Sequence, residues 1–515
     1  MLSKMMGLGT GVKRVWAERE VKPLSYNRRG GLALALLLVL GLFGSVVIAL
    51  SARAQPPDVP QQLLAKARER GSVRVIVGLD VEFRVEGALS SLQAAQEQRQ
   101  GIARAQRAVA QKLAADHATV VARFKTIPFM AFEVDADGLL ALAALPEITS
   151  FEEDVPVPPD LATATVAIGA DVAWAAGYTG QGQTVAILDT GVDKTHPFFG
   201  TGGDKVVSEA CYSTNSASPR ATSVCPGGVE ASTAPGSGVN CDVSITRCDH
   251  GTHVAGIAVG DNGSGPNFGV ARGATVIAVQ VFSRFDDDAE GSDTPCASNL
   301  MPSPCALTFF TDQIKGLERV LELRNDFDIA AVNMSLGGQR YSDPETCDSE
   351  HASRKAAIDN LRSVGIATIA SSGNSGYRTS MGAPACISTV ISVGATWDDP
   401  VVAWFSNVAS FLDLLAPGVH IESSVPGTAE VSKDGTSMAA PMVTGAWAVA
   451  RAVSPSETIT DILTLFRETG ISVDDTRMPG GIVTDMRRIN LGVAMETLAF
   501  RRANKAYMPV ILGNP

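Results

Sequence analysis

Short, continuous apolar runs alternate with helix-period segments over most of residues 165–500. The apolar runs predict strands at residues 184–188, 275–282, 329–334, 366–370 and 390–393. Between them, a helical period recurs at residues 250–259, 311–323 and 353–364. Strands that are apolar on both faces are typical of a parallel sheet covered by helices on both sides. The pattern therefore predicts an α/β domain with a mostly parallel sheet.

A smaller region with its own pattern precedes this domain, at residues 55–160. Strand-like runs at 73–79, 131–134 and 148–151 alternate with helical stretches at 92–124 and 138–144. This order predicts a compact α+β module of about 100 residues. The module ends in Val-Pro-Val-Pro-Pro, which predicts an exposed linker into the larger domain at residues 161–500. Helices are expected at residues 454–469 and 488–495, and a short tail at residues 501–515.

The first 54 residues have the composition of an export signal. Basic residues precede an uncharged, Leu-rich run at 30–50, and Ala52-Arg53-Ala54 follows as a cleavage site. We expect cleavage after Ala54 and secretion of the remainder. The alternative is an uncleaved anchor, because an apolar run of about 20 residues is long enough to span a bilayer. The Arg28-Arg29 pair also suggests twin-arginine export, but the residues after it match that signal poorly.

Composition narrows the classes of function. The chain has 515 residues, a formal net charge of -12 and 45% hydrophobic residues. This length and apolar content are sufficient for about two or three domains with a substantial core. The acidic balance argues against nucleic acid as a partner, because phosphate binding requires a basic face. We expect a monomer that contacts a membrane only if the signal segment stays uncleaved.

All eight cysteines lie between residues 211 and 386. An even number of cysteines in an exported chain indicates disulfides. Pairing of sequence neighbours is the simplest arrangement: Cys211 with Cys225, Cys241 with Cys248, Cys296 with Cys305, and Cys347 with Cys386. A free thiol at Cys248 is the weaker alternative. The sequence contains no Cys-x-x-Cys, which argues against a zinc site.

Four polar residues lie at strand carboxyl ends and helix starts, where the functional residues of parallel sheets are usually found. They are Asp189 after the strand at 184–188, His250 at a helix start, Asn374 after the strand at 366–370, and Ser437 where Gly-Thr-Ser enters an Ala-rich helix. Three of them have a simpler explanation, because Asp and Asn are common turn residues and Ser is a common helix cap. His250 and His253 could also be a metal pair, although no third ligand accompanies them.

Asp, His and Ser follow one another along the chain in the order found in subtilisin. The chain resembles the subtilisin-like serine proteases through three motifs: Asp189-Thr190-Gly191, His250-Gly251-Thr252-His253 and Gly435-Thr436-Ser437-Met438-Ala439-Ala440-Pro441. The resemblance covers about residues 165–500 and implies a serine endopeptidase that works through an acyl-enzyme. One rival is a catalytically silent relative that serves as a binding or surface module. Another is a dinucleotide-binding enzyme, but the first strand lacks Gly-x-Gly-x-x-Gly.

The resemblance implies a role for each polar position. Ser437 would attack the scissile carbonyl, His250 would transfer the proton, and Asp189 would orient and stabilise the imidazole. Asn374 and the Ser437 backbone N–H would bind the oxyanion, and His253 would be structural. This chemistry requires no cofactor.

The expected substrate is a protein or peptide. Residues 333–338 resemble the family's substrate-pairing segment, which makes Ser335, Leu336 and Gly337 the expected substrate-binding residues. They would bind an extended chain through main-chain hydrogen bonds. The residues expected around the primary pocket carry no charge, which favours an apolar or broad preference.

An acidic insert at residues 286–293 follows the strand expected at the edge of the substrate groove. It could favour basic residues upstream of the cut, bind structural calcium, or be a solvated loop. Specific metal ligands stay unassigned.

The module at residues 55–160 resembles the family's inhibitory propeptide. The resemblance implies that its tail lies in the active cleft and is cut by the enzyme itself. We expect this cut between about residues 154 and 165. The chain would then be a self-processed zymogen whose own propeptide is an intramolecular inhibitor.

Overall fold

The computed structural model describes residues 59–113, 117–154, 166–263, 268–288, 291, 293–477 and 483–511. The chain divides into residues 1–54 and 55–515, and every described residue belongs to the second unit. The predicted export signal and the predicted cleavage segment after Asp154 therefore lie outside the described residues. None of the helices in the described part combines the length and the apolar character needed to cross a bilayer.

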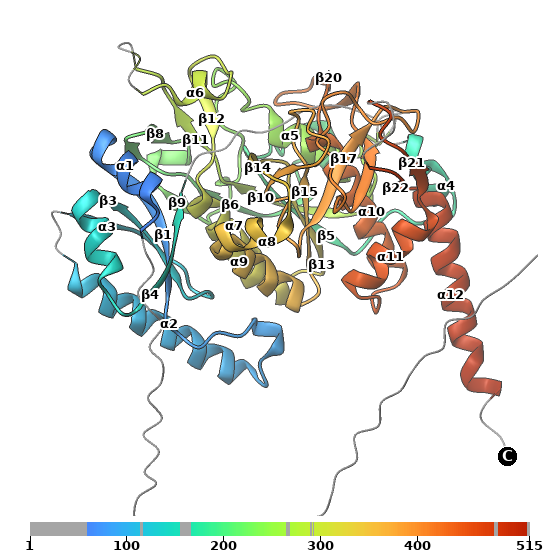
Figure 1. Ribbon diagram of the computed structural model, residues 1–515. Helices are drawn as coiled ribbons and strands as arrows, with labels where there is room; N and C mark the ends of the chain where they lie inside the picture. Colours follow the sequence, from blue (N-terminus) through green and yellow to red (C-terminus); the bar gives the residue numbers. More distant parts are fainter. Residues whose placement is uncertain are drawn as a thin grey trace, which may run out of the picture. The chain divides into compact units, whose positions relative to one another are not determined.

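The larger domain is built on a sheet with ten strands among the described residues (Figure 1). In spatial order they are β21 (Ile471–Val473), β22 (Met486–Arg488), β18 (Leu414–Pro417), β17 (Ile391–Thr396), β15 (Ala367–Ser371), β13 (Ile329–Met334), β5 (Thr184–Asp189), β10 (Thr275–Gln280), β6 (Val206–Tyr212) and β9 (Ala231–Ser232). The strands from β22 to β6 run parallel, and β21 and β9 pair antiparallel at the edges. The predicted mostly parallel sheet is confirmed.

Strand β5 shows why the apolar runs are continuous. Val185 and Ile187 pack into one hydrophobic core, whereas Ala186 and Leu188 pack into another. Alternate side chains of a strand point to opposite faces, so a strand covered on both sides must be apolar throughout. The first core also contains α5 (His250–Val259) and α10 (Thr436–Val453), and the second contains α7 (Phe310–Glu322) and α9 (Ala352–Ser363).

Smaller elements complete the domain. The other helices are α4 (Ala170–Ala175), α6 (Pro295–Ser298), α8 (Pro344–Glu350), α11 (Ile459–Thr469) and α12 (Leu491–Ile511). The other strands are β7 (Ser216–Ala217), β8 (Arg220–Ser223), β11 (Ser283–Phe285) and β12 (Cys305–Leu307), and the pairs β14 (Gly338–Tyr341) with β16 (Met381–Ala383) and β19 (Ile421–Ser424) with β20 (Glu430–Lys433). Helix α11 begins later than predicted because Thr458 and Asp461 form a capping box at its start. Helix α12 extends beyond the predicted closing helix into the region expected to be a tail.

The N-terminal module, residues 59–154, is an antiparallel sheet packed with helices. Its strand order is β2 (Ala118–Arg123), β3 (Phe129–Val134), β1 (Val73–Leu79) and β4 (Ile148–Glu153), and its helices are α1 (Gln61–Arg70), α2 (Leu92–Lys112) and α3 (Ala136–Ala143). The predicted α+β class is confirmed, but the helix predicted at 92–124 is wrong over its last part. Residues 118–123 form β2 because the β-branched Thr119, Val120 and Val121 favour a strand, and β3 supplies a pairing edge.

Four disulfides join the cysteines that the neighbour pairing predicts, which confirms that pairing. Cys248 is bonded to Cys241, so the free-thiol alternative is wrong. The Cys241–Cys248 bond closes the loop that leads directly into α5. Closing such a loop restricts the unfolded chain and thereby favours the folded one.

Candidate active site

Asp189 is the last residue of β5 and is fully buried. Its Oδ1 atom lies 2.7 Å from Nδ1 of His250, the first residue of α5, whose ring is also buried. The same oxygen accepts a hydrogen bond of 2.7 Å from the backbone N–H of Thr190. A carboxylate placed in this way can orient an imidazole and stabilise it when it takes up a proton.

Glycine and threonine residues next to Asp189 and His250 allow the contact between these two side chains. Thr190 Oγ1 accepts a hydrogen bond of 2.8 Å from the N–H of Gly251, which ties the end of β5 to the start of α5. A Cβ at Gly251 would lie 2.3 Å from the Gly191 carbonyl oxygen. Gly191 has a φ of 92°, and a Cβ there would lie 2.1 Å from the Val239 oxygen. Both glycines are therefore required by the close approach of these segments.

His253 lies one turn further along α5 and is fully buried. Its Nε2 atom lies 3.0 Å from the Val431 carbonyl oxygen. Burial and the nearby charge of Lys433 lower the pKa of His253 to about 3, so the ring is neutral near pH 7. The part of the chain that the structure describes contains no group of three His, Cys, Asp or Glu side chains arranged to hold a metal ion.

Ser437 is the second residue of α10 and is buried. Its Oγ lies 3.2 Å from the carbonyl oxygen of Ser335, just after β13, and 3.5 Å from Oγ of Ser371, the last residue of β15. Strands β15, β13 and β5 are direct neighbours in the sheet. Ser437 and Asp189 therefore lie along the same edge of the sheet, at the carboxyl ends of adjacent parallel strands.

Asn374 lies in the loop after β15 and is held by the start of α10. Its Oδ1 accepts hydrogen bonds from the N–H and Oγ1 of Thr436, at 2.9 Å and 3.0 Å. Because these bonds occupy the Asn374 amide oxygen, the Asn374 Nδ2 group is the one that can donate to a different acceptor. Asn407 Oδ1 supports the same loop by accepting from the N–H groups of Ser375 and Tyr377, each at 3.0 Å.

Ser335, Leu336 and Gly337 connect β13 to β14 beside Ser437. Ser335 Oγ donates a hydrogen bond of 2.7 Å to the Ser437 carbonyl oxygen, and the Leu336 side chain is fully buried. A Cβ at Gly337 would lie 2.7 Å from the Ala383 oxygen. This segment is therefore fixed by α10 on one side and by β16 on the other.

Asn333 begins the segment at 333–338, and its support of the Ser437 backbone was not predicted. Its Nδ2 donates to Ser335 Oγ at 2.8 Å, and its Oδ1 accepts from Thr444 Oγ1 at 3.0 Å. A buried chain of hydrogen bonds thus links β13 to α10 next to the Ser437 backbone. The available signal was an amide within an otherwise apolar strand, because a buried amide needs partners.

Asp249, directly before His250, forms an ion pair with Lys433 of β20. Burial lowers the pKa of Lys433. Burial opposes ionisation of Asp249, but the charge of Lys433 holds the pKa of that carboxyl below its ordinary value. The pair anchors the β19–β20 hairpin to the start of α5.

The acidic insert at 286–293 has internal partners for several of its carboxylates. Asp286 pairs with Arg284 at 2.7 Å, and Asp287 accepts hydrogen bonds from the N–H groups of Cys296 and Ala297 at 2.8 Å and 3.1 Å. Asp293 accepts from the Arg220 N–H at 2.9 Å. These contacts fold the insert onto α6 and β8.

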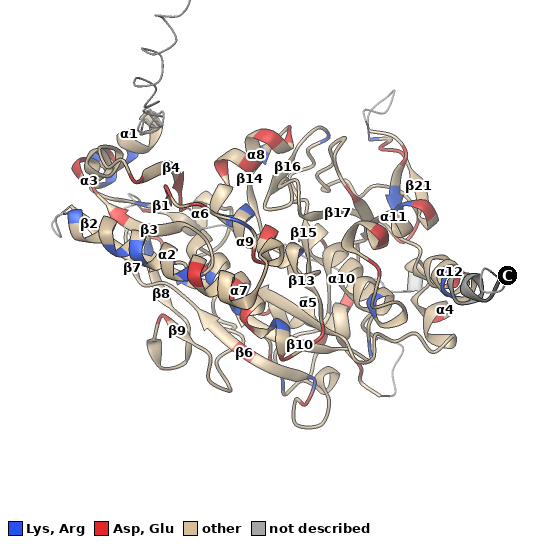
Figure 2. Ribbon diagram, turned by 90° about the horizontal axis from the view of Figure 1, so that it is seen from below, with Lys and Arg blue, Asp and Glu red and all other residues tan. Residues whose placement is uncertain are grey.

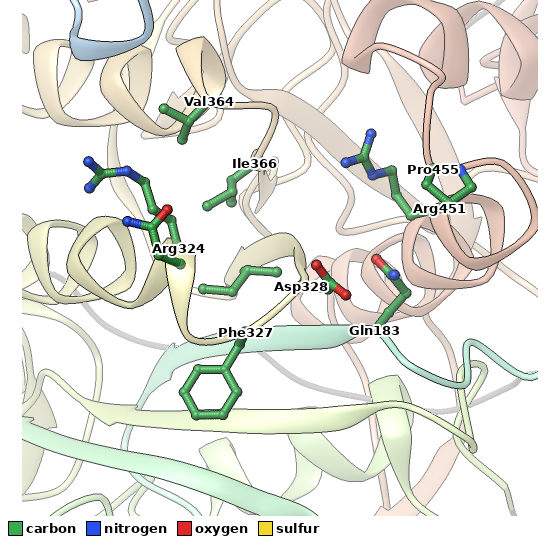
Figure 3. Close-up of a pocket in the computed structure, with 10 residues that line it drawn as sticks. Gln183, Arg324, Phe327, Asp328, Val364, Ile366, Arg451 and Pro455 are labelled. Atoms are coloured by element: carbon green, nitrogen blue, oxygen red, sulfur yellow. The ribbon is translucent and has the colours of Figure 1, made fainter. Parts of the chain in front are cut away.

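A cavity of about 360 Å³ lies at the opposite end of the sheet (Figure 3). Arg324 and Arg451 flank it, and its wall includes Asp328, Ile329 and Ile366. Ile329 begins β13, so the cavity is at the amino ends of the strands. It is therefore separated from Ser437 by the length of the sheet.

The N-terminal module contacts α7 and α9 through acidic residues at the end of β4, and both views place its sheet beside these helices (Figures 1 and 2). Asp154 accepts hydrogen bonds from the N–H and Oγ1 of Thr311, both at 3.0 Å. Arg74 Nε donates to Asp154 at 3.0 Å. Burial nevertheless raises the pKa of Asp154.

Glu152 makes the corresponding contact at the start of α9. Its Oε1 lies 3.1 Å from His351 Nδ1, and its Oε2 accepts from the N–H of Ser353 at 3.3 Å and from Ser353 Oγ. Arg354 Nε lies 3.9 Å from Oε1. All four residues are buried, so the module covers the start of this helix.

A further buried contact joins the loop after β2 to the middle of α7. Glu318 Oε1 accepts from the N–H and Oγ1 of Thr126 at 2.7 Å and 2.8 Å. Burial raises the pKa of Glu318. The module is thus attached to the catalytic domain through several buried polar groups.

Comparisons with known proteins identify the family of the larger domain. The model of the Subtilase family matches residues 180–478. An alkaline protease of Alkalihalobacillus alcalophilus is 31% identical over 360 residues, which cover 69% of this chain and 78% of that protein. Subtilisin BL of Lederbergia lenta is 31% identical over 304 residues, covering 59% and 89% respectively. The matched region contains Asp189, His250, Asn374 and Ser437.

Proposed function

This chain belongs to the subtilase family of serine endopeptidases, and on that premise we propose that Ser437, His250 and Asp189 are its catalytic triad. The observation that carries the proposal is the buried contact of 2.7 Å between Asp189 Oδ1 and His250 Nδ1. Ser437 supports it by lying at the same edge of the sheet, at the start of a helix. The three residues come from three separate elements, the end of β5 and the starts of α5 and α10.

In the proposed reaction, Ser437 Oγ attacks the scissile carbonyl while His250 takes its proton. His250 then donates that proton to the leaving amine, and Asp189 stabilises the charged imidazole in between. The Ser437 N–H and Asn374 Nδ2 would donate to the oxyanion, and Thr436 supports this role by occupying the Asn374 oxygen. Water then releases the acyl group by the same steps in reverse.

Subtilisin-like proteases act on proteins or peptides. We propose that the main chain of Ser335, Leu336 and Gly337 pairs with an extended substrate. The fixed placement of this segment beside Ser437 supports the proposal, because a segment that is already ordered binds an extended chain with little further loss of conformational entropy.

We also propose that the N-terminal module is an inhibitory propeptide and that the chain is exported and then processes itself. The buried contacts of Asp154, Glu152 and Thr126 with α7 and α9 support an intramolecular partner rather than an independent domain. The proposed cut lies between about residues 154 and 165, after the last described residue of the module. Active protein whose amino terminus is Gln55 would refute this processing.

The test of the proposed activity compares wild type with Ser437→Ala. Each protein is incubated with a fluorophosphonate probe and, separately, with an unfolded protein substrate. We expect labelling and hydrolysis only in the wild type. Labelling of both proteins would refute the role of Ser437, and an inert wild type would favour a catalytically silent relative.

A further inference from the structure

Arg354 is a fully buried cation on α9 that the proposed reaction does not use. Its Nη1 donates to Gln313 Oε1 at 3.2 Å, and its guanidinium lies 3.6 Å from the centroid of the Phe310 ring. Within the described residues, its Nε and Nη2 atoms have no hydrogen-bond partner. Burial lowers the pKa of Arg354 to about 10, so it is still charged at neutral pH.

The Glu152 carboxylate is the group that compensates this cation. It lies in a pocket formed by His351 Nδ1, the N–H and Oγ of Ser353, and Arg354. Every one of these donors belongs to the catalytic domain. The pocket is also at the start of α9, where the helix dipole favours an anion.

Removal of the module takes Glu152 away but leaves the donors behind. Removal also uncovers the start of α9, and the donors that remain, including the Arg354 cation, are still arranged to bind a carboxylate. The neighbouring Glu350 already accepts a hydrogen bond of 2.7 Å from Tyr341, so its carboxylate is engaged. The emptied pocket should therefore take up another carboxylate.

A second set of donors lies at the start of α7. The N–H and Oγ1 of Thr311 hold Asp154, which follows Glu152 by two residues. In an extended chain, side chains two residues apart point to the same face. The two helix starts thus match an extended segment that carries acidic side chains at alternate positions.

We propose that the processed enzyme uses the starts of α9 and α7 as a docking surface for extended acidic segments of protein substrates. The inference rests on removal of the module in the proposed function. The α9 pocket contributes most to binding of the acidic segment, because Arg354 remains with the enzyme. Arg74, the cation beside Asp154, leaves with the module. The proposed reaction does not use the donors at these two helix starts, so the surface acts on affinity rather than on the chemical step.

The first experiment measures binding to processed enzyme that a fluorophosphonate has inactivated. The probe is a fluorescent peptide with the sequence of residues 149–154, Thr-Ser-Phe-Glu-Glu-Asp, and the readout is anisotropy. We expect saturable binding that weakens about tenfold or more when the peptide carries Glu152→Gln and Asp154→Asn, because charge-assisted hydrogen bonds are lost. Equal binding of the two peptides, or no saturable binding, overturns the proposal.

Enzyme variants locate the site. Ser353→Ala and Arg354→Gln should weaken binding of the acidic peptide, whereas Lys355→Gln, which removes a charge elsewhere on α9, should not. In hydrolysis assays, Ser353→Ala should raise KM for a protein substrate with alternate acidic residues and leave kcat and KM for a short neutral peptide unchanged. An equal change for both substrates contradicts a docking role. If Arg354→Gln fails to fold, the binding and hydrolysis measurements on Ser353→Ala are sufficient to test the proposal.

A second experiment does not depend on processing. In the full chain with Ser437→Ala, the further substitution Glu152→Ala empties the pocket and should lower Tm. Acetate should restore Tm in a saturable manner, acetamide should not, and Ser353→Ala should abolish the rescue. Absence of rescue overturns the carboxylate pocket. If the wild-type chain is never processed while the Ser437→Ala chain shows rescue, the proposed zymogen is refuted and the pocket stands.

Discussion

Asn374 is held through its oxygen by Thr436, so only its amide nitrogen is free to meet a substrate. Asn374→Asp keeps the acceptor and removes the donor. We expect kcat to fall by about 10² to 10³-fold with little change in KM, the range that loss of one oxyanion donor costs in subtilisin. Steady-state kinetics on a neutral peptide measure this, and thermal unfolding provides the control for folding. Unchanged kcat would remove Asn374 from the oxyanion site.

The low pKa of His253 predicts that the folded chain becomes less stable in acid. Its pKa is about 3 in the folded chain and about 6.5 when unfolded, so the unfolded state binds more protons between these values. The contribution of neutral His253 to the free energy of unfolding is therefore fully present above pH 6.5. It is lost as the pH falls towards 3, and the loss over the whole range is about 3–5 kcal/mol.

The measurement compares urea unfolding of the Ser437→Ala chain with and without His253→Gln. Glutamine keeps a donor for the Val431 carbonyl but does not titrate. We expect the stability advantage of His253 to shrink as the pH is lowered from neutrality to about 4. A constant difference between the two chains would show that burial of His253 does not govern acid unfolding.

At the scale of elements, the disulfides differ in the length of chain that they close. Cys241–Cys248 spans 7 residues and Cys347–Cys386 spans 39. Loop-closure entropy predicts that replacing each pair by serine costs about 2–3 kcal/mol for the shorter loop and about 4 kcal/mol for the longer one. Chemical unfolding of the two double variants tests the order.

The shorter disulfide should have the larger effect on activity, because its loop leads directly into His250. We expect its loss to lower kcat/KM more than loss of Cys347–Cys386, which lies away from the triad motifs. The opposite order in activity would indicate that Asp189 and the ends of α5 are sufficient to position His250.

Element types followed from local patterns where the pattern was long and regular. β5 and α10 are predicted correctly because an apolar run or a helical period extends over the whole element. β2 was missed because its six residues follow a long helical pattern, and only pairing with β3 makes them a strand. Short elements depend on partners that are distant in sequence.

At the scale of the whole molecule, Glu318 ties the module to α7 through Thr126. Glu318→Ala should leave two buried donors unsatisfied and weaken the attachment by about 1–3 kcal/mol. In a chain that processes itself, we expect activity to appear sooner after the cut, because the module is released faster.

The measurement follows the cut by gel electrophoresis and activity by hydrolysis of a neutral peptide. Glu322→Gln is a control, because Glu322 is partly exposed and pairs with the exposed Lys125 at the margin of the same contact. An unchanged delay in Glu318→Ala would show that this buried contact does not hold the module in place.

Sequence alone left the disulfide partners as a simplest arrangement that only the structure confirmed, but it determined the fold class and the positions of Asp189, His250, Asn374 and Ser437. These follow from residue types within short windows, namely continuous apolar strands, helix starts and motifs whose glycines permit close approach. Tertiary structure decided which groups hold these residues. The Asn333–Thr444 bond, the contact of Thr436 with Asn374 and the acidic contacts of the module join residues far apart in sequence. Such pairings depend on packing of whole elements against one another, and no local window contains that information.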